Sequence, residues 1–185
     1  AATRVGADGL IEKGRENLIL QSNNFDTTWL NQLGTGTITS GQSGYDGSTD
    51  AWEISKDTST FRSIRQAITA SGVLTYSVYI KSGTLTDAAL RVDTSGGAVQ
   101  VLFDLTDGSS LLAGGTAITK GSENIGGGWY RCFVTLNASV SNVHIYVDRD
   151  GTTAGSIYIQ DAQLEIGLAA TDVISTGATT GKAGL

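Results

Sequence analysis

Seven side chains of types that can recognise sugars recur along the alternating segments of this sequence. Sugars offer C–H surfaces that stack on aromatic rings, and hydroxyls that pair with planar polar groups. If the apolar residues of each strand point into a core, the opposite side gathers Tyr79, Arg91, Asp93, Arg131, His144, Tyr146 and Asp148. Such a face can bind a saccharide. It can equally be a solvated face or a subunit interface, where Tyr and Arg are enriched.

The sequence offers little for catalysis. It has one His, and it lacks a Ser/His/Asp spacing, an H-E-x-x-H motif and a phosphate loop, because Gly126–Gly128 is not followed by Lys and a helix. Asp93 and Asp148 could in principle serve a glycosidase, but acids on a β surface usually only solubilise it. We therefore expect no enzyme. We expect His144 to be a surface or interface side chain and Cys132 a buried small hydrophobe.

Composition limits the classes of protein further. The length of 185 residues favours one domain, and 39% apolar residues suffice for a core. The net charge is −6 and no stretch concentrates Lys or Arg, so we expect no nucleic-acid partner. No apolar run approaches the ~20 residues of a membrane span, so we expect no membrane partner either. A single Cys excludes an internal disulfide.

The elements that must position these side chains are short strands. Apolar and polar residues alternate over 63–69, 74–81, 88–93, 99–104, 129–136 and 143–148, and an apolar run at 18–20 predicts the first strand. Glycine-rich turns separate many of them at a spacing of ~8–12 residues, which is typical of an all-β sandwich or barrel. Alternation with one apolar face favours two packed antiparallel sheets.

The stretch Gly155–Gly167 has an unusual pattern. Ile157 and Ile159 share one parity with Asp161 and Glu165, so acids fall among the apolar positions of a strand. Such a strand is either a sheet edge or a place where something binds.

Several segments resemble a jelly-roll module common in phage structural proteins, which is similar to the jelly rolls of carbohydrate-binding modules. The segments that carry the resemblance are 16–25 with Trp29, 74–83, 103–108, 128–132 and 157–167. The match runs from about Glu16 to Ile174, and the arm segments 2–5 and 9–12 also resemble phage virion proteins. The resemblance implies an antiparallel two-sheet jelly-roll β-sandwich. Its expected division is an N-terminal arm over 1–15, the sandwich over 16–168 and a glycine-rich tail over 169–185.

The resemblance also implies a function. We expect a non-enzymatic structural or adhesion module of a tail fibre, a capsid fibre or another virion appendage, located in the virion. Its expected partners are other virion proteins, itself as a homotrimer, and a host-surface polysaccharide. The alternative is an extracellular carbohydrate-binding module of a polysaccharide-degrading enzyme.

No cofactor is expected apart from one cation that the resemblance suggests. In related jelly rolls a structural calcium often joins the first strand to the last. Asp161, with Asn24 or Asp26, could supply the oxygens that calcium prefers. The alternative is a capped loop in which Asp161 accepts backbone N–H groups. In either case Asp161 is expected to pin the closing strand beside Leu18–Leu20.

Overall fold

The computed structural model describes residues 3–5, 11–57, 61–148, 151 and 153–183. In this part of the chain all regular structure is β and every strand pair is antiparallel, as predicted. The strands are β1 (Thr3–Val5), β2 (Ile11–Lys13), β3 (Glu16–Asn17), β4 (Leu30–Leu33), β5 (Ile38–Gln42), β6 (Ala51–Lys56), β7 (Arg62–Ser82), β8 (Asp87–Thr94), β9 (Gly97–Asp104), β10 (Ser110–Gly114), β11 (Thr119–Gly126), β12 (Trp129–Val147), β13 (Gly155–Ile166) and β14 (Gly181–Lys182).

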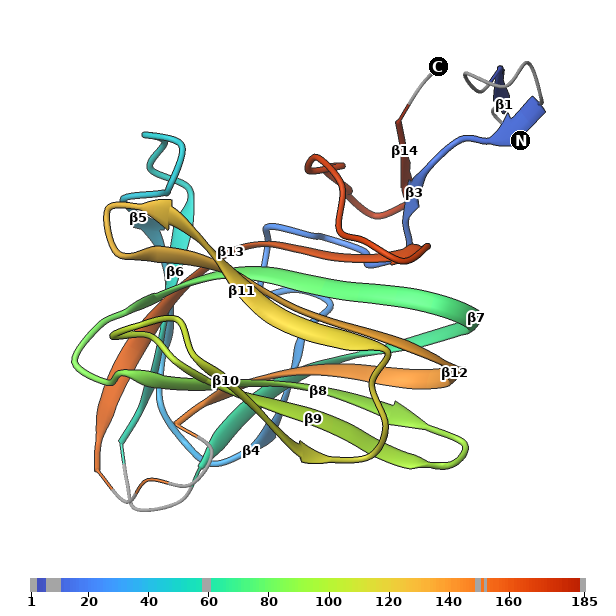
Figure 1. Cartoon of the computed structure of the whole chain (residues 1–185). Helices are drawn as coiled ribbons and strands as arrows, with labels where there is room; N and C mark the ends of the chain where they lie inside the picture. Colours follow the sequence, from blue (N-terminus) through green and yellow to red (C-terminus); the bar gives the residue numbers. More distant parts are fainter. Residues whose placement is uncertain (1–2, 6–10, 58–60, 149–150, 152, 184–185) are drawn as a thin grey trace.

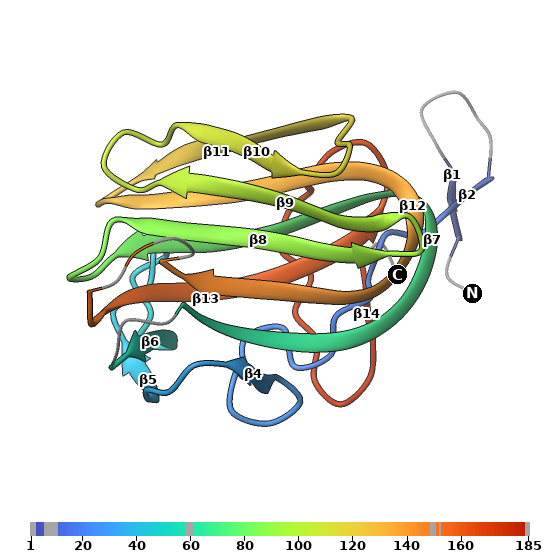
Figure 2. The ribbon, with the colours of Figure 1, turned by 90° about the horizontal axis from the view of Figure 1, so that it is seen from below.

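Two long strands, β7 and β12, pair with each other and belong to both layers of the sandwich. Their segments 62–70 and 140–147 form the first layer with β4, β8, β9 and β10. Their segments 74–82 and 129–136 form the second layer with β5, β6, β11 and β13. Both ribbons curve at the same end of the molecule (Figure 2). The fold is therefore the antiparallel two-sheet jelly-roll sandwich that the sequence predicts.

The strand boundaries differ from the prediction at the bend of β7 and β12 and at the first predicted strand. The alternating segments 63–69 and 74–81 belong to one strand, as do 129–136 and 143–147, because the antiparallel pairing continues through the bend. Gly72, with φ +104°, supplies the backbone conformation that this bend requires. The predicted strand at 18–20 is wrong, because β3 ends at Asn17; the Leu18 N–H nevertheless donates to the Leu164 carbonyl over 2.8 Å.

The core lies between the two layers and consists of the apolar residues that alternate along their strands. It includes the fully buried side chains Tyr76, Val78, Ile80, Leu90, Cys132, Val134 and Ile145. Cys132 is thus a buried hydrophobe, as predicted, and its burial raises the pKa of its thiol.

The mixed pattern of Gly155–Gly167 is explained by a β-bulge. Asp161 has φ +49°, and the register of β13 against β7 shifts between Gln160 and Gln163. Ile157 before the bulge and Leu164 after it therefore both face the core, although they differ in parity.

The C-terminal segment 168–177 lies across the second layer (Figure 1). Asn17, which is fully buried, ties this segment to β13: its Nδ2 donates to the carbonyls of Ala162 and Ile174 over 3.0 Å each. Its Oδ1 accepts the N–H groups of Ile19 and Leu164 over 3.1 Å each. The division at residues 15 and 168 stays a prediction, while these contacts show how 168–177 is held.

Candidate functional site

The register of the second layer aligns side chains in rows across its outer face. The residues in each row are direct cross-strand neighbours, so they point to the same side of the sheet. The two central rows are Trp129–Lys81–Tyr158–Glu53 and Glu123–Arg131–Tyr79–Gln160. We call these eight residues the outer face of the second layer.

The seven predicted sugar-binding residues do not share one face. Tyr79 and Arg131 lie on the outer face of the second layer. The corresponding face of the first layer, on the other side of the sandwich, carries Arg91, Asp93, His144 and Tyr146. Asp148 directly follows β12. Alternation along a strand indicates which side chains point outward, but it does not indicate from which layer.

The first-layer residues pair with one another through Asp93, while His144 Nδ1 is buried and has no hydrogen-bond partner within the described residues. The Asp93 carboxylate accepts the Arg91 Nε–H and pairs with His144 Nε2, each over 2.8 Å. The rings of His144 and Tyr146 stack with centroids 5.9 Å apart. Both residues are only 2% exposed, so the prediction of a surface position for His144 is wrong. Burial lowers the pKa of His144, and Asp93 offsets this only in part.

The two acids considered for glycosidase chemistry are both held by cations. Burial acts to raise the pKa of Asp93, but hydrogen bonds from His144 and Arg91 hold it below its ordinary value. Asp148 forms a buried ion pair with Lys56 Nζ over 2.8 Å. A glycosidase acid needs a raised pKa to remain protonated. Asp93 therefore does not suit that role.

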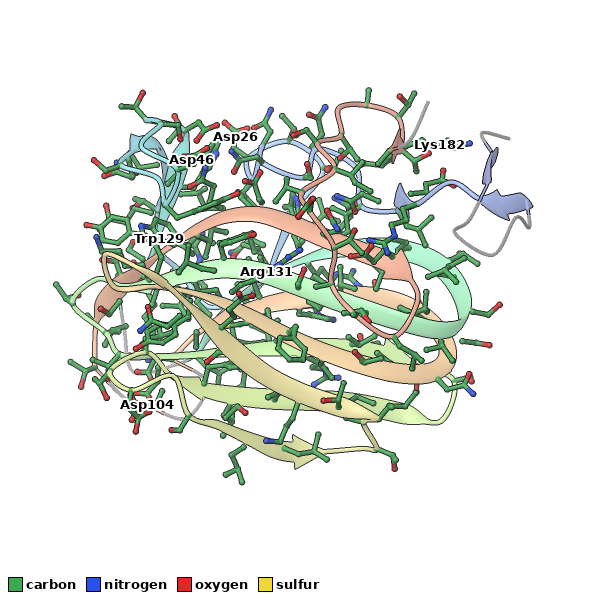
Figure 3. All side chains as sticks on the ribbon, turned by 45° about the horizontal axis from the view of Figure 1, so that its top comes forward. Asp26, Asp46, Asp104, Trp129, Arg131 and Lys182 are labelled. Atoms are coloured by element: carbon green, nitrogen blue, oxygen red, sulfur yellow. The ribbon has the colours of Figure 1, made fainter. Side chains whose placement is uncertain are left out.

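Arg131 occupies the middle of the outer face of the second layer (Figure 3). Its guanidinium lies 5.2 Å from the centre of the Tyr79 ring, within the range of a cation–π contact. Its Nη2 donates to Ser77 Oγ and to the Thr171 carbonyl of the C-terminal segment. Its Nε is buried and has no hydrogen-bond partner within the described chain.

Beside Arg131 the surface is hollowed into a groove of about 280 Å³, which we call the Arg131 groove. It is lined by Thr119, Glu123, Arg131, Phe133, Leu168, Ala169 and Ala170. A partly exposed aromatic ring, a guanidinium, a carboxylate and a hydroxyl thus converge there. Phe133 was not among the predicted site residues, although its position two residues after Arg131 on the same strand gave the signal.

Tyr45, in the loop between β5 and β6, was also missed. Its ring stacks on Tyr79 with centroids 3.9 Å apart and planes 6° apart, and so covers one face of that ring. Its hydroxyl donates to Asp161 Oδ2 over 2.9 Å. Burial, followed by the charge of Asp161, raises the pKa of Tyr45. The alternation of apolar and polar residues predicts the orientation of side chains only within strands. It therefore gave no indication of where Tyr45, a loop residue, would lie.

Among the Asp and Glu residues of the described ranges, Asp161 has the pKa that departs furthest from its ordinary value. Burial raises the pKa of Asp161 to about 6; Asp50 and Asp46 raise it further, and the Tyr45 hydrogen bond opposes them. The Asp161 N–H donates to Asn23 Oδ1 over 3.3 Å. The carboxylate partner in the structure is therefore a phenol, and not the backbone N–H groups expected of a capped loop.

The residues proposed for calcium are only partly brought together. No hydrogen bond joins Asn24 or Asp26 to Asp161 in the described part of the chain, and Asn23 takes the expected place. Over the same ranges, no three His, Cys, Asp or Glu side chains form a group that could hold a metal ion. A calcium ion at Asn24, Asp26 and Asp161 stays a prediction.

Comparison with known proteins assigns no family. No family model matches the chain, and no curated protein matches it. The described ranges contain no helix long and apolar enough to cross a membrane.

Several solved structures are similar to this chain at low sequence identity. The tailspike protein 4 enzymatically active domain of bacteriophage CBA120 is 16% identical, with a TM-score of 0.49, over 80% of this chain and 21% of that one. TmCBM61 in complex with β-1,4-galactotriose is 14% identical, with a TM-score of 0.48, over 80% and 97%. The CBM22-1–GH10 modules of Clostridium thermocellum xylanase 10B with xylohexaose are 14% identical, with a TM-score of 0.49, over 87% and 30%. This chain thus spans about a fifth of the tailspike chain. At this level the likeness identifies neither ligand nor partner.

Proposed function

We propose that this chain is a non-catalytic, extracellular module that binds polysaccharide in the Arg131 groove. The observation that carries the proposal is the Arg131 groove itself, where a guanidinium, a partly exposed aromatic ring, a carboxylate and a hydroxyl converge in one hollow of about 280 Å³. A few convergent polar groups beside an aromatic ring are typical of ligand sites. Phe133 supplies a ring for the C–H face of a sugar, and Glu123 and Thr119 supply acceptors for its hydroxyls.

The first-layer cluster supports this proposal less well. The Asp93 carboxylate already pairs with Arg91 Nε and His144 Nε2, and the Tyr146 ring is buried rather than open to a sugar. A ligand there would have to break existing interactions before it gained new ones.

The test is glycan-array binding, followed by affinity electrophoresis on the polysaccharides that score. Phe133→Ala should weaken retardation about tenfold or more, because it removes the stacking surface of the groove. Arg91→Ala, on the opposite face, is the matched control and should bind like the wild type. Loss of binding in Arg91→Ala with full binding in Phe133→Ala would move the site to the first layer. An array on which the wild type binds nothing would contradict the function itself.

We further propose a second role, as part of a phage virion appendage in which the module associates with itself as a homotrimer and with other virion proteins. Two features support an assembly. The β1–β2 hairpin stands away from the sandwich (Figures 1 and 2). Ile166, which lines a hollow with Gly14, Arg15 and Glu16 directly after β2, is 59% exposed, which is costly for a large apolar side chain unless a partner covers it. Virion location and the use of a host-surface glycan follow from this role.

A further inference from the structure

We propose that the polysaccharide bound by this chain is anionic, and that Lys81 forms a second subsite that recognises a sugar carboxylate. This inference rests on the proposed function and adds to it the chemical class of the ligand. It starts from a second hollow on the outer face of the second layer, separate from the Arg131 groove. That hollow has a volume of about 220 Å³ and is lined by Gln42, Ser43, Lys81 and Tyr158. We call it the Lys81 groove.

The polar groups of the Lys81 groove are unpaired within the chain. No hydrogen bond or ion pair holds the Lys81 ammonium, the Tyr158 hydroxyl or the Ser43 hydroxyl within the described ranges. Gln42 uses its Nε2 to donate to Ser40 and leaves its carbonyl oxygen available. One hollow thus presents an ammonium, two hydroxyls and an amide oxygen, in the pattern of few, convergent polar groups typical of small-ligand sites.

The groove is also held in shape. Tyr158 packs against the cluster formed by Ala51, Tyr79 and Trp129. Trp129 and Tyr158 are the direct cross-strand neighbours of Lys81 on its two sides. The adjacent β11–β12 turn passes close to the lysine: a Cβ on Gly128 would lie 3.6 Å from Lys81 Cε. The ammonium is therefore presented from a rigid aromatic surface, which lowers the ordering cost of binding.

The charge arrangement points to an anion. The chain has 18 acidic against 12 basic residues, yet the two cations at the centre of this face, Lys81 and Arg131, have no carboxylate partner in the described chain. They lie on the adjacent strands β7 and β12, one row apart, or about 7 Å along the strand. Glu53 and Glu123 occupy the outer ends of the two rows. Sugar carboxylates can meet the central cations, while the acids at the rim accept sugar hydroxyls.

The experiment compares polygalacturonic acid with its methyl ester, which has the same backbone without the charge, and with a neutral galactan, by isothermal titration calorimetry. The wild type should bind the acid about tenfold more tightly than the ester, because the acid alone offers charge-assisted hydrogen bonds. Lys81→Gln should remove most of that preference, so that the acid and the ester bind with similar affinity. Added salt should weaken the binding of polygalacturonic acid and not the binding of its ester.

Lys120→Gln is the matched control, since it removes the same charge where the ammonium is already bound by Ser110; it should keep the preference for the acid. Dextran sulfate, as a further arm, distinguishes carboxylate recognition from a general attraction to polyanions, because equal effects of Lys81→Gln on both polymers would overturn the carboxylate assignment. Equal affinity of the wild type for acid and ester would overturn this inference while leaving glycan binding intact. Failure to bind any of these polymers, together with an empty glycan array, would overturn the proposed function as well.

Discussion

The hydroxyl of Tyr45 donates to the carboxylate of Asp161 over 2.9 Å, across 116 positions in the sequence. This bond joins the β5–β6 loop to the bulge of the closing strand. Two further acids lie close by, because the side chain of Gln160, the residue before Asp161, donates to the carboxylates of Asp46 and Asp50. The stability of the fold should therefore depend on the protonation of Asp161.

The first prediction concerns pH. The folded-state pKa of Asp161 is raised to about 6, above the ~3.9 of an unfolded Asp. Its contribution to stability is therefore complete below about pH 4 and is lost as pH rises through about 6. Asp161→Asn keeps an acceptor for Tyr45 and suits the left-handed backbone. The difference in free energy of unfolding between Asp161→Asn and the wild type should therefore shift in favour of the variant as pH rises from 4 to 7, by on the order of 2–3 kcal/mol.

Urea denaturation across this pH range measures the difference. Tyr45→Phe is a control for the direction of the effect. It removes the hydrogen bond that lowers the pKa of Asp161, so the loss of stability caused by ionisation of Asp161 should move to higher pH. A difference between Asp161→Asn and the wild type that stays constant from pH 4 to 7 would contradict the assignment.

The second prediction concerns calcium. If Asp161 and the Asn24–Asp26 turn share a calcium ion, millimolar calcium should raise Tm and a chelator should lower it. At a calcium concentration of a hundred times Kd, the free energy of unfolding should increase by about 3 kcal/mol. The ion would also hold Asp161 ionised and so abolish the pH dependence described above. Differential scanning calorimetry with Asp161→Asn as the control decides, since that variant should not respond. Identical melting of the wild type with calcium and with chelator would exclude the site.

The third prediction concerns Asn17, whose side chain makes four hydrogen bonds in a fully buried position. Asn17→Ala leaves two carbonyls and two N–H groups without partners, which should cost about 3 kcal/mol or more. Asn17→Asp should cost at least as much, because a carboxylate cannot donate to Ala162 and Ile174. Thr27→Ala, which removes one exposed hydrogen bond to the Asn24 carbonyl, should cost less than about 1 kcal/mol. Equal urea midpoints for Asn17→Ala and Thr27→Ala would refute this role.

Alternation predicted the sandwich because it reports burial directly. Tyr76, Val78 and Ile80 face the core as expected, since β7 has no bulge over this part. Alternation could not show that β7 continues into the first layer, because the exposed residues Ser71 and Gly72 have the composition of a turn.

The candidate site was predictable only in part, for two physical reasons. A strand that crosses both layers places outward side chains on opposite sides of the molecule, which separates Arg131 from His144. Tyr45 and the C-terminal segment then cover polar positions such as Glu165, which binds the N–H and hydroxyl of Thr171. The C-terminal segment is also held by bonds between residues distant in sequence, such as the one from the Gln21 N–H to the Gly177 carbonyl. The Ala, Thr and Gly composition of 169–185 carries no periodic signal for these contacts.

The fourth prediction concerns assembly. Size-exclusion chromatography with light scattering should give three times the 19.1 kDa of one chain, because Ile166 exposes a large apolar surface beside Gly14, Arg15 and Glu16, directly after β2. Ile166→Asp places a charge in that contact and should shift the mass toward one chain. Leu111→Asp, a residue 64% exposed on β10 of the first layer, should leave the mass unchanged. A wild-type mass of one chain, at concentrations where the protein binds polysaccharide, would favour the free extracellular module over the virion appendage.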